Sequence, residues 1–562
     1  GGIGFLFRFV VNRLLGLGFR LFHRGFDSAT VGYLFLIRGS LRVVPVMLLL
    51  YAGLIYLTLE LFSRCPVGFI PGQDKGYLLV NIQLPDSAAL SRTDRVVKQV
   101  SEIARETAGI RHVIAVAGQS QVLGANAPNL GTLFVVLEPF EARRARELSA
   151  EAILQTLQTR VDESITEGLV RVFPAPAVEG LGTVGGFKLM LEQRANADEP
   201  TARGQSGPPT GGPQLLQQVA DELVDAGNRS PELQGVFTGF RADSPWLELR
   251  LDREAAEARG VSVGAVLTAL QIYYGSLYVN DFNRFGRTWQ VNVQADQRFR
   301  HRADDPRRIR VPNRNGVMVP LGDFISLQET SGPVMLIRHN LYAAAPITGT
   351  PAPGVSTGRA LSTMDKLAAE MVPPDMKPTW TELAYLQRQT GNTAVWAFSL
   401  SVILVFLVLA AQYESWALPL AVILVVPMCL LSAAAGVLLA GHDINIFTQV
   451  GFVVLIGLAC KNAILIVEYA RARREAGLSR RHATLEACRL RLRPIVMTSF
   501  AFIFGVLPLM LAEGAGAEMR RLLGTAVFSG MLGVTLFGIF LTPVFFLAIQ
   551  WATDRLRGIQ TD

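Results

Sequence analysis

The sequence has few of the residues from which enzyme active sites and metal centres are built. Only four of its 562 residues are cysteine and no two of them form a Cys-x-x-Cys pair, so neither a disulfide framework nor a thiolate metal site is predicted. The six histidines are scattered without ligand spacing. There is no GxxxxGK[ST] loop and no Ser/His/Asp or Cys/His constellation. The sequence therefore argues against an enzyme, a metal site and a bound cofactor.

Charge is also scarce and unevenly placed. Charged residues make up 18% of the chain, hydrophobic residues 50%, and the mean hydropathy is +0.32, which is too apolar for a soluble protein of this size. The net charge of +7 is concentrated in particular loops: six arginines precede residue 43, and eight lie between Arg471 and Arg493. Short basic loops are typical of the cytoplasmic side of membrane proteins, so nucleic-acid binding is the weaker explanation.

Six segments are long and apolar enough to cross a bilayer. One lies at 43–61, and five lie within 394–551 at 394–411, 418–440, 446–469, 494–512 and 523–549. An even number of spans places both ends of the chain on one side, and the basic loops assign that side to the cytoplasm. Residues 1–24 mix apolar residues with four arginines, a pattern typical of an interfacial amphipathic helix. The chain opens on Gly-Gly without Met or a signal peptide, so we expect it to be part of something longer.

Residues 62–393 contain no run that could span a bilayer, so this block lies opposite the cytoplasm. Its first part predicts strands at 77–84, 112–117 and 132–137 and helices at 91–108 and 150–165, which is the order of a ferredoxin-like βαβ unit. A second helix and strand are predicted at 214–226 and 246–251. Between the two sets, 193–213 is rich in Gly, Pro, Thr and Ser and predicts a mobile surface loop.

A single lysine, Lys461, interrupts the apolar run 451–469. A cation at that depth costs about 2.5–3.5 kcal/mol on insertion scales, so it should have a partner or a function. The alternative is that it snorkels toward the end marked by Arg471. Glu468 shares its helical face at i+7, but the rise of a helix separates the two backbones by roughly 10 Å. The charge-free part of the first segment ends at Leu59. Apart from Glu468, the apolar runs contain no Asp or Glu, so the partner of Lys461 must come from elsewhere.

Eight motifs point to one family. They are AAQYESWALP from residue 410, GLACKNAILIVEYA from 457, RLRPIVMTSFAF from 491, FIPGQDKG from 69, GLGTVGGF from 180, YVNDFNRFGR from 278, GVMVPLGDF from 316 and PGVSTGRA from 353. With these motifs the chain resembles the resistance-nodulation-division (RND) efflux pump permeases of the hydrophobe/amphiphile (AcrB/MexB-type) branch. The resemblance runs from residue 1 to about 552 and covers the C-terminal half of such a pump.

The resemblance implies an architecture and partners. Two periplasmic porter subdomains are expected, one at 74–180 and one formed by 181–244 with 333–388, and a docking subdomain at 245–332 is inserted into the second. Family members are homotrimers of the bacterial inner membrane, and they work with a periplasmic adaptor protein and an outer-membrane channel. They need no cofactor, because transport is coupled to protons.

The resemblance also implies a proton relay. The lysine at the position of Lys461 pairs in relatives with two aspartates on the fourth helix, which belongs to the N-terminal half. Thr498 matches a hydroxyl beside this cluster, although a threonine bonded to its own helix carbonyl explains it as well. Arg491 matches a proton-path residue, although anchoring at the cytoplasmic end accounts for any arginine there. Asn462 could bond the cluster or a neighbouring helix.

Substrate-contacting residues follow from the same resemblance. Phe134 and Phe173 match pocket phenylalanines, with core packing as the alternative. The loop 118–126 corresponds to a Phe/Gly-rich switch loop but carries Gln119 and Gln121 where aromatic residues are expected, which predicts a more polar pocket. Thr183 lies in the flexible loop between the porter subdomains.

The predicted function is therefore proton-motive-force-driven export of amphiphilic small molecules by a secondary transporter. A metal-ion exporter of the same superfamily is the first alternative, but residues 74–180 contain no methionine, and thioethers are the soft ligands that suit monovalent copper or silver. A non-transporting membrane scaffold or secretion accessory is the second alternative. It would not require Lys461.

A first prediction follows from the missing carboxylates. Because the chain does not supply the acidic partner of Lys461, we expect liposomes that contain only this chain to show no proton-gradient-dependent efflux. Fluorescent-substrate release after an imposed pH gradient measures this. Gradient-dependent efflux from such liposomes would contradict the prediction.

Overall fold

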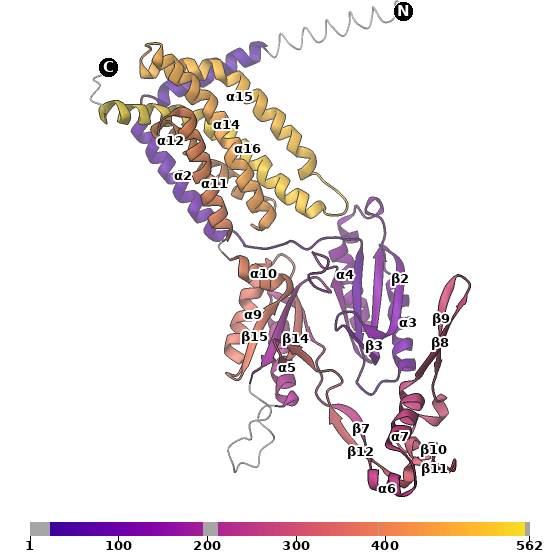
Figure 1. Cartoon of the computed structure of the whole chain (residues 1–562). Coiled ribbons are helices and arrows are strands. Elements are labelled where there is room, and N and C mark those ends of the chain that lie inside the picture. The colour runs from indigo at the N-terminus through magenta and orange to yellow at the C-terminus, as the bar shows by residue number, and fades with distance from the viewer. Residues whose placement is uncertain (1–22, 195–211, 392, 557–562) are drawn as a thin grey trace, which may run out of the picture.

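The computed structural model describes residues 23–194, 212–391 and 393–556, which form a helical bundle and an elongated α/β body (Figure 1). Two connections join these parts: the segment after α2 and the passage from α10 into α11. The predicted interfacial helix at 1–24 lies almost wholly outside the described residues. Residues 23–40 are helical, and they pack Tyr33 and Ile37 into the core of the bundle.

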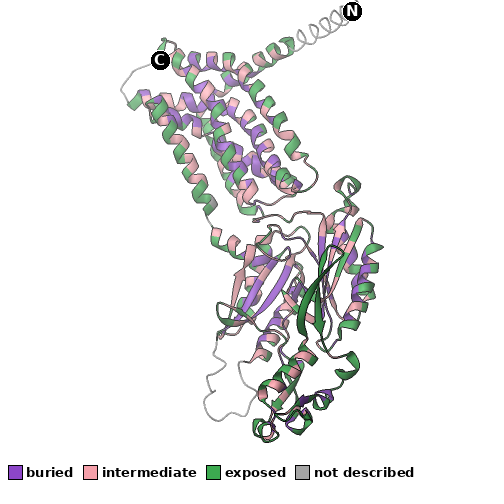
Figure 2. Cartoon of the chain, turned by 45° about the vertical axis from the view of Figure 1, so that its right-hand side comes forward, coloured by how far each residue is buried: buried purple, intermediate pink, exposed green. Residues whose placement is uncertain are grey.

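Within the described residues, six helices are long and apolar enough to cross a membrane, which confirms the six apolar helices predicted from the sequence. They are α2 (Val44–Arg64), α11 (Thr393–Tyr413), the broken pair α12 (Ala417–Ile423) and α13 (Val426–Leu439), α14 (Ile446–Glu475), α15 (Arg480–Met510) and α16 (Ala517–Leu556). Buried residues gather along the middle of the bundle, and the outer helix faces are exposed (Figure 2).

Small residues bring α13 and α16 close together. A Cβ at Gly436 of α13 would collide with Ser529 of α16, and a Cβ at Gly533 of α16 would collide with Ser432 of α13. This reciprocal Gly/Ser arrangement lets the two backbones approach closely, as is common between membrane helices. It places α16 at the centre of the bundle.

Two buried tyrosines donate hydrogen bonds to backbone carbonyl groups that lack their usual partner within the helix. Pro543 inside α16 has no N–H, so the carbonyl of Ile539 loses its usual partner, and Tyr33 Oη donates to it (2.9 Å). Between α12 and α13, Met428 N bonds to Val425 instead of Leu424, and Tyr51 Oη donates to the Leu424 carbonyl (2.7 Å). Since lipid offers no hydrogen bonds, these two contacts stabilise the helices at these points.

The first α/β unit is a four-stranded antiparallel sheet of order β2-β3-β1-β4 with two helices on one face. Its elements are β1 (Tyr77–Gln83), α3 (Leu90–Arg105), β2 (Ile110–Ser120), β3 (Ala125–Leu137), α4 (Ala150–Ser164) and β4 (Leu169–Pro174). Each strand and helix predicted between residues 77 and 165 is present, and β4 completes the sheet. A core of valine, leucine and isoleucine lies between the sheet and its helices.

The second α/β unit is assembled from two stretches of chain, because a long excursion separates β6 from β13. Its sheet has the order β13-β14-β5-β15, and β6 also pairs with β14. The elements are β5 (Phe187–Gln193), α5 (Pro213–Arg229), β6 (Leu233–Thr238), β13 (Ile337–His339), β14 (Tyr342–Pro351), α9 (Thr357–Met371), β15 (Met376–Thr381) and α10 (Glu382–Thr390). Most of the loop predicted at 193–213 lies outside the described residues.

The excursion leaves and returns through the antiparallel pair β7 (Ser244–Leu251) and β12 (Ile325–Gly332), in which Ser244 lies opposite Gly332. It has its own small core and lies at the end of the body far from the bundle (Figure 1). A hairpin of β8 (Leu277–Arg284) and β9 (Arg287–Val293) projects from it, and every residue of both strands is exposed. The other helices and strands are α6 (Arg253–Ala258), α7 (Val263–Leu270), α8 (Asp305–Arg308), β10 (Arg310–Pro312) and β11 (Met318–Pro320).

A buried carboxylate orders one edge of the second unit. Glu192 on β5 is 0% exposed and accepts hydrogen bonds from Asn340 Nδ2 (2.8 Å) and Arg194 Nη2 (2.9 Å), while His339 Nδ1 lies at 2.8 Å. Burial alone would raise the pKa of Glu192, but these contacts lower it to about 2. Glu192 is therefore charged at neutral pH and pins the turn between β13 and β14, which is a structural role.

The tyrosine contacts yield a second prediction. We expect Tyr51→Phe to destabilise the protein by about 1 kcal/mol, because it leaves the Leu424 carbonyl without a donor in an apolar setting. The thermal midpoint of the detergent-solubilised protein, measured at a fixed heating rate, reports the loss. The matched control is Tyr56→Phe on the same helix, where the side chain is 70% exposed. Equal midpoints for the two variants would contradict the assignment.

Candidate functional site

A short stretch after α2, residues 66–74, ties the bundle to the second α/β unit, and we call it the junction segment. Gly68 N donates to the Ile444 carbonyl (3.1 Å) on the connection between α13 and α14. On its other side, Phe69 N donates to Thr357 Oγ1 (3.2 Å) in the first turn of α9. The segment therefore contacts both the membrane helices and the second unit directly.

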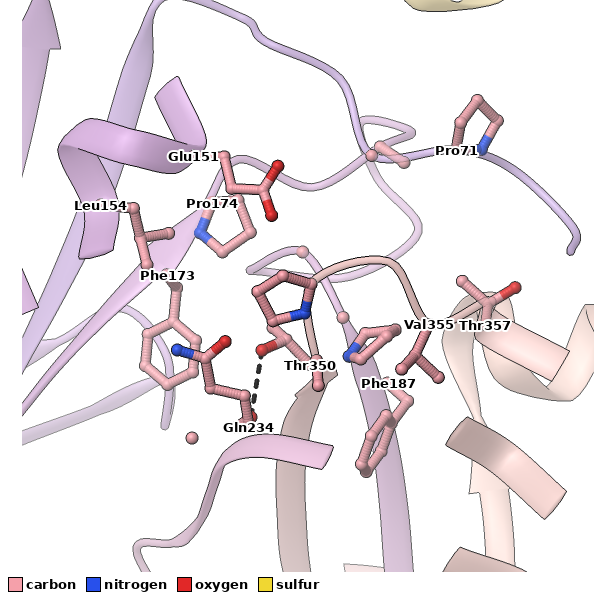
Figure 3. A pocket seen from close by; sticks show the side chains of 18 of the residues that line it. Pro71, Glu151, Leu154, Phe173, Pro174, Phe187, Gln234, Thr350, Val355 and Thr357 are labelled. Carbon is pink, nitrogen blue, oxygen red and sulfur yellow. Dashed lines mark hydrogen bonds between the residues drawn. The ribbon is translucent and has the colours of Figure 1, made fainter. Parts of the chain in front are cut away.

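Beside the junction segment lies a cavity of about 720 Å³ between the two α/β units. Its walls come from α4 and β4 of the first unit and from α10 and the β14–α9 loop of the second. Figure 3 shows Glu151 and Leu154 extending from α4 on one side, with Val355 on the other. Asp443 and Glu518 border the cavity toward the bundle.

The lining combines apolar and acidic side chains. The larger apolar residues include Phe69, Ile70, Leu154, Phe173, Phe187, Val355, Leu361 and Leu383. The acidic residues are Asp74, Glu151, Asp162, Asp443 and Glu518, and Arg171 is the one basic residue among the described lining. An apolar wall with a few charged groups is the usual composition of a small-molecule site.

Two of the lining carboxylates are neutralised by arginine. The Arg143 side chain is 2% exposed and holds Asp74 through both nitrogens, with Nη1–Oδ2 at 2.9 Å and Nη2–Oδ1 at 3.2 Å. Arg171 Nη1 lies 3.2 Å from Asp162 Oδ1. The first pair fixes the end of the junction segment against the first unit, because bidentate arginine–carboxylate contacts constrain geometry.

The sheet face of the first unit opposite α3 and α4 carries an apolar cluster shared with the second unit. Leu79 of β1 lies between Phe134 of β3 and Phe173 of β4, since both are paired with it in register. Phe173 is 2% exposed, and its ring centroid lies 6.4 Å from that of Phe237 on β6. Phe173 thus joins the two units as well as lining the cavity.

The tip of the β2–β3 hairpin adds apolar residues to this interface. Val122 is buried in the cluster, and Leu123 packs on Gly239 of the second unit, where a Cβ would collide with the leucine side chain. Gln119 and Gln121 flank the tip and are exposed. The residues that hold the two units together here are therefore aliphatic.

The structure brings only part of the predicted substrate set to the cavity. Among the described residues of that set, Phe173 lines it. Phe134 is half-buried at the edge of the apolar cluster, and Thr183 is half-buried in the loop that precedes β5. Gln119 and Gln121 lie outside the cavity lining. Whether these residues contact substrate stays a prediction.

The predicted relay residues lie on α14 and α15. Lys461 is exposed on α14, and no described carboxylate forms an ion pair with it. Asn462, its buried neighbour, donates from Nδ2 to Ser499 Oγ of α15 (3.1 Å). Thr498 is exposed, and its Oγ1 donates to the Ile495 carbonyl (3.1 Å) of its own helix. These side chains do not converge on one point.

Arg491, the fourth predicted relay residue, stacks on an aromatic ring. Its guanidinium carbon lies 4.9 Å from the centroid of Tyr469, and Arg473 lies 5.0 Å from the same ring. The Arg491 Nε is buried, and within the described structure it has no hydrogen-bond partner. Cation–π stacking on a tyrosine between two arginines orients this group near the end of α14.

Sequence reasoning missed the carboxylates that border the cavity on its membrane side. Asp443 and Glu518 lie just before the apolar runs of α14 and α16. Asp443 could have been found as a carboxylate next to an apolar run at the end opposite the arginines, whereas Glu518 is followed by Arg520 and Arg521 and does not stand out. Glu151, in the first turn of α4, gave no such signal.

Comparison with known proteins places this architecture among described transporters. The model of the AcrB/AcrD/AcrF family matches residues 11–550. The chain is 36% identical over 534 residues to the toluene efflux pump membrane transporter TtgB of Pseudomonas putida, which covers 95% of this chain and 49% of TtgB. It is 36% identical over 536 residues to the multidrug export protein AcrF of Escherichia coli (strain K12), covering 95% of this chain and 50% of AcrF. The chain spans about half the length of these curated relatives.

The hairpin tip yields a third prediction. We expect Leu123→Asp to release the tip from the second unit, because a carboxylate placed against Gly239 loses apolar contact and is partly desolvated. Faster hydrogen–deuterium exchange in peptides covering 118–126 and β6 would report the release. Gln121→Asp, two residues away and exposed, serves as the matched control. Unchanged exchange in Leu123→Asp would show that the contact does not hold the units together.

Proposed function

The chain belongs to the AcrB/AcrD/AcrF family of RND efflux permeases, and on this premise we propose that it forms the C-terminal half of an inner-membrane permease that exports hydrophobic or amphiphilic small molecules. The names of the relatives, which refer to toluene, multidrug and solvent efflux, support this substrate class. The permease is a secondary transporter that uses the proton gradient and needs no cofactor.

The observation that carries the proposal is Lys461. Its ammonium sits in the apolar run of α14 and faces away from the core of the bundle, so it requires a carboxylate from another helix. We propose that two aspartates of the N-terminal half supply it. Protonation of an aspartate removes the attraction to the lysine, which lets helices shift and couples proton entry to a change of shape. Thr498, Asn462 and Arg491 tune this relay in the proposal.

The α/β body handles the substrate in this proposal. Residues 74–180 form one ferredoxin-like porter subdomain, and 181–244 with 333–388 form the other. The cavity between them is the substrate entrance, because it opens beside the membrane helices and has mixed apolar and polar walls. Residues 245–332 form the docking subdomain, supported by their separate core and distal position (Figure 1).

The orientation and assembly follow from charge and exposure. The arginines of the α14–α15 connection lie at the end of the bundle far from the α/β body, which supports a cytoplasmic location for that end and for both termini, and a periplasmic one for the body. The β8–β9 hairpin exposes Phe282 and Trp289 on an isolated ribbon, which is marginally stable without a partner. This supports a homotrimer that works with a periplasmic adaptor and an outer-membrane channel.

A fourth prediction tests the role of the lysine. In the complete pump we expect Lys461→Ala to reduce efflux to the background rate while the protein accumulates normally, since the relay then lacks its cation. Growth with an exported solvent and export of a fluorescent substrate from energised cells measure the loss.

The matched control is Lys98→Ala, which removes a lysine whose side chain is 71% exposed on α3. It should leave efflux unchanged, because surface ion pairs contribute little. Wild-type tolerance in Lys461→Ala would overturn the relay and favour a non-transporting scaffold, which does not need this lysine.

A further inference from the structure

We propose that the cavity between the two α/β units selects cationic amphiphiles, through the carboxylates of Glu151, Asp443 and Glu518. The inference rests on the proposed export function and adds a charge class to its substrates. It stands on an open cavity with largely apolar walls, and in this proposal the carboxylates determine which ligand charge the cavity accepts.

The charges of the lining do not balance. Among the described residues, five carboxylates face the cavity and one arginine does. Arg143, which is buried and does not line the cavity, neutralises Asp74, and Arg171 neutralises Asp162. Glu151, Asp443 and Glu518 form no ion pair with any described residue, so three carboxylates of the lining are left without a paired cation.

None of these three carboxylates is paired with a cationic side chain of the described residues. Glu518 keeps Oε2 buried, and this atom has no hydrogen-bond donor within the described structure. Asp443 Oδ1 accepts from the neutral amide of Asn445 (2.8 Å). Glu151 stands in the first turn of α4 and is directed from that helix toward the opposite wall (Figure 3).

The nearest basic groups form no ion pair with them. Arg521, one turn beyond Glu518, donates from Nε to the Ala512 carbonyl, and Arg520 donates to the carbonyls of Glu513 and Ala515. Both arginines are thereby engaged by the α15–α16 connection. Burial lowers the pKa of His442, the neighbour of Asp443, so this imidazole is neutral at pH 7.

The remaining walls suit the apolar part of such a molecule. Leu154 and Phe173 line one side, and Phe187, Val355 and Leu361 line the other. A volume of about 720 Å³ accommodates a drug-sized ligand. Apolar walls lower the local dielectric, so a ligand cation gains more from the carboxylates than it would in water, and an anion is repelled more strongly. The chain as a whole carries +7, so this acidity is a local property of the cavity.

The test compares two probes in cells that carry the complete pump. Ethidium is a cationic aromatic dye, and N-phenyl-1-naphthylamine is a neutral one, and both are followed by fluorescence. We expect the triple variant Glu151→Gln, Asp443→Asn, Glu518→Gln to lower the rate of ethidium export about tenfold, because it removes the excess charge. Export of the neutral naphthylamine should stay within about twofold of the wild type.

A second pair of variants covers the case in which the triple variant fails to accumulate. Gln155 lines the cavity on α4 and is uncharged. Gln155→Glu should raise ethidium export relative to naphthylamine export, and Gln155→Lys should lower it. Glu102→Gln is the control, because Glu102 is an exposed carboxylate on α3 outside the cavity lining, and it should change neither rate.

The outcomes separate the two proposals. If the wild type exports neither probe, the export function itself fails. If the wild type exports both probes and the triple variant slows both equally, or if the two Gln155 variants behave alike, charge selection is overturned while export stands. A selective loss of ethidium export, with opposite effects of Glu and Lys at position 155, supports the proposal.

Discussion

A single ammonium group within an apolar helix is the constraint on which the membrane part of this protein depends. The face of α14 that carries Ala459, Ala463 and Ile466 is buried against neighbouring helices, and the opposite face carries Lys461 and stays open. Bringing a lysine to this depth costs several kcal/mol unless a carboxylate meets it. The helix is therefore fixed to the bundle on one side and needs a charged partner on the other, which is the arrangement that the proposed proton-driven movement requires.

The absence of water inside a membrane also requires that the backbone carbonyl groups of the helices find partners within the protein. The proline inside α16 and the break between α12 and α13 leave carbonyl groups free, and hydroxyl groups of Tyr33 and Tyr51 satisfy them. Both tyrosines come from the start of the described chain, and both acceptors lie several hundred residues later. The early helices are thus tied to the late ones by hydrogen bonds as well as by packing.

Local sequence patterns predicted the helices and strands well, whereas contacts between residues far apart in the sequence could not be predicted from them. The apolar runs predicted the six long helices, the strand pattern predicted β1, and helical patterns predicted the ends of α3 and α4 within a few residues. The cavity was not predictable, because its walls join residues as far apart as Glu151, Val355 and Glu518. The inward packing of Val122 and Leu123 at the hairpin tip was not predicted either, and substrate contact at Gln119 and Gln121 stays a prediction. Which residue of a tight turn points inward depends on backbone geometry that spacing does not reveal.

The lysine and the cavity are connected by one continuous structural path. The helix that carries Lys461 is capped at its start by Asn445, which accepts hydrogen bonds from the backbone of its first turn. The residue before that cap, Ile444, is bonded to the junction segment, and the junction segment is bonded to the first turn of α9, a wall of the cavity. A shift of α14 therefore moves the cap, the junction segment and that wall together, because hydrogen bonds and not a flexible linker join them. Asp443 lies two residues before the cap on the α13–α14 connection, so in the proposed pump the charge presented to a substrate is joined to the helix that carries the proton-relay lysine.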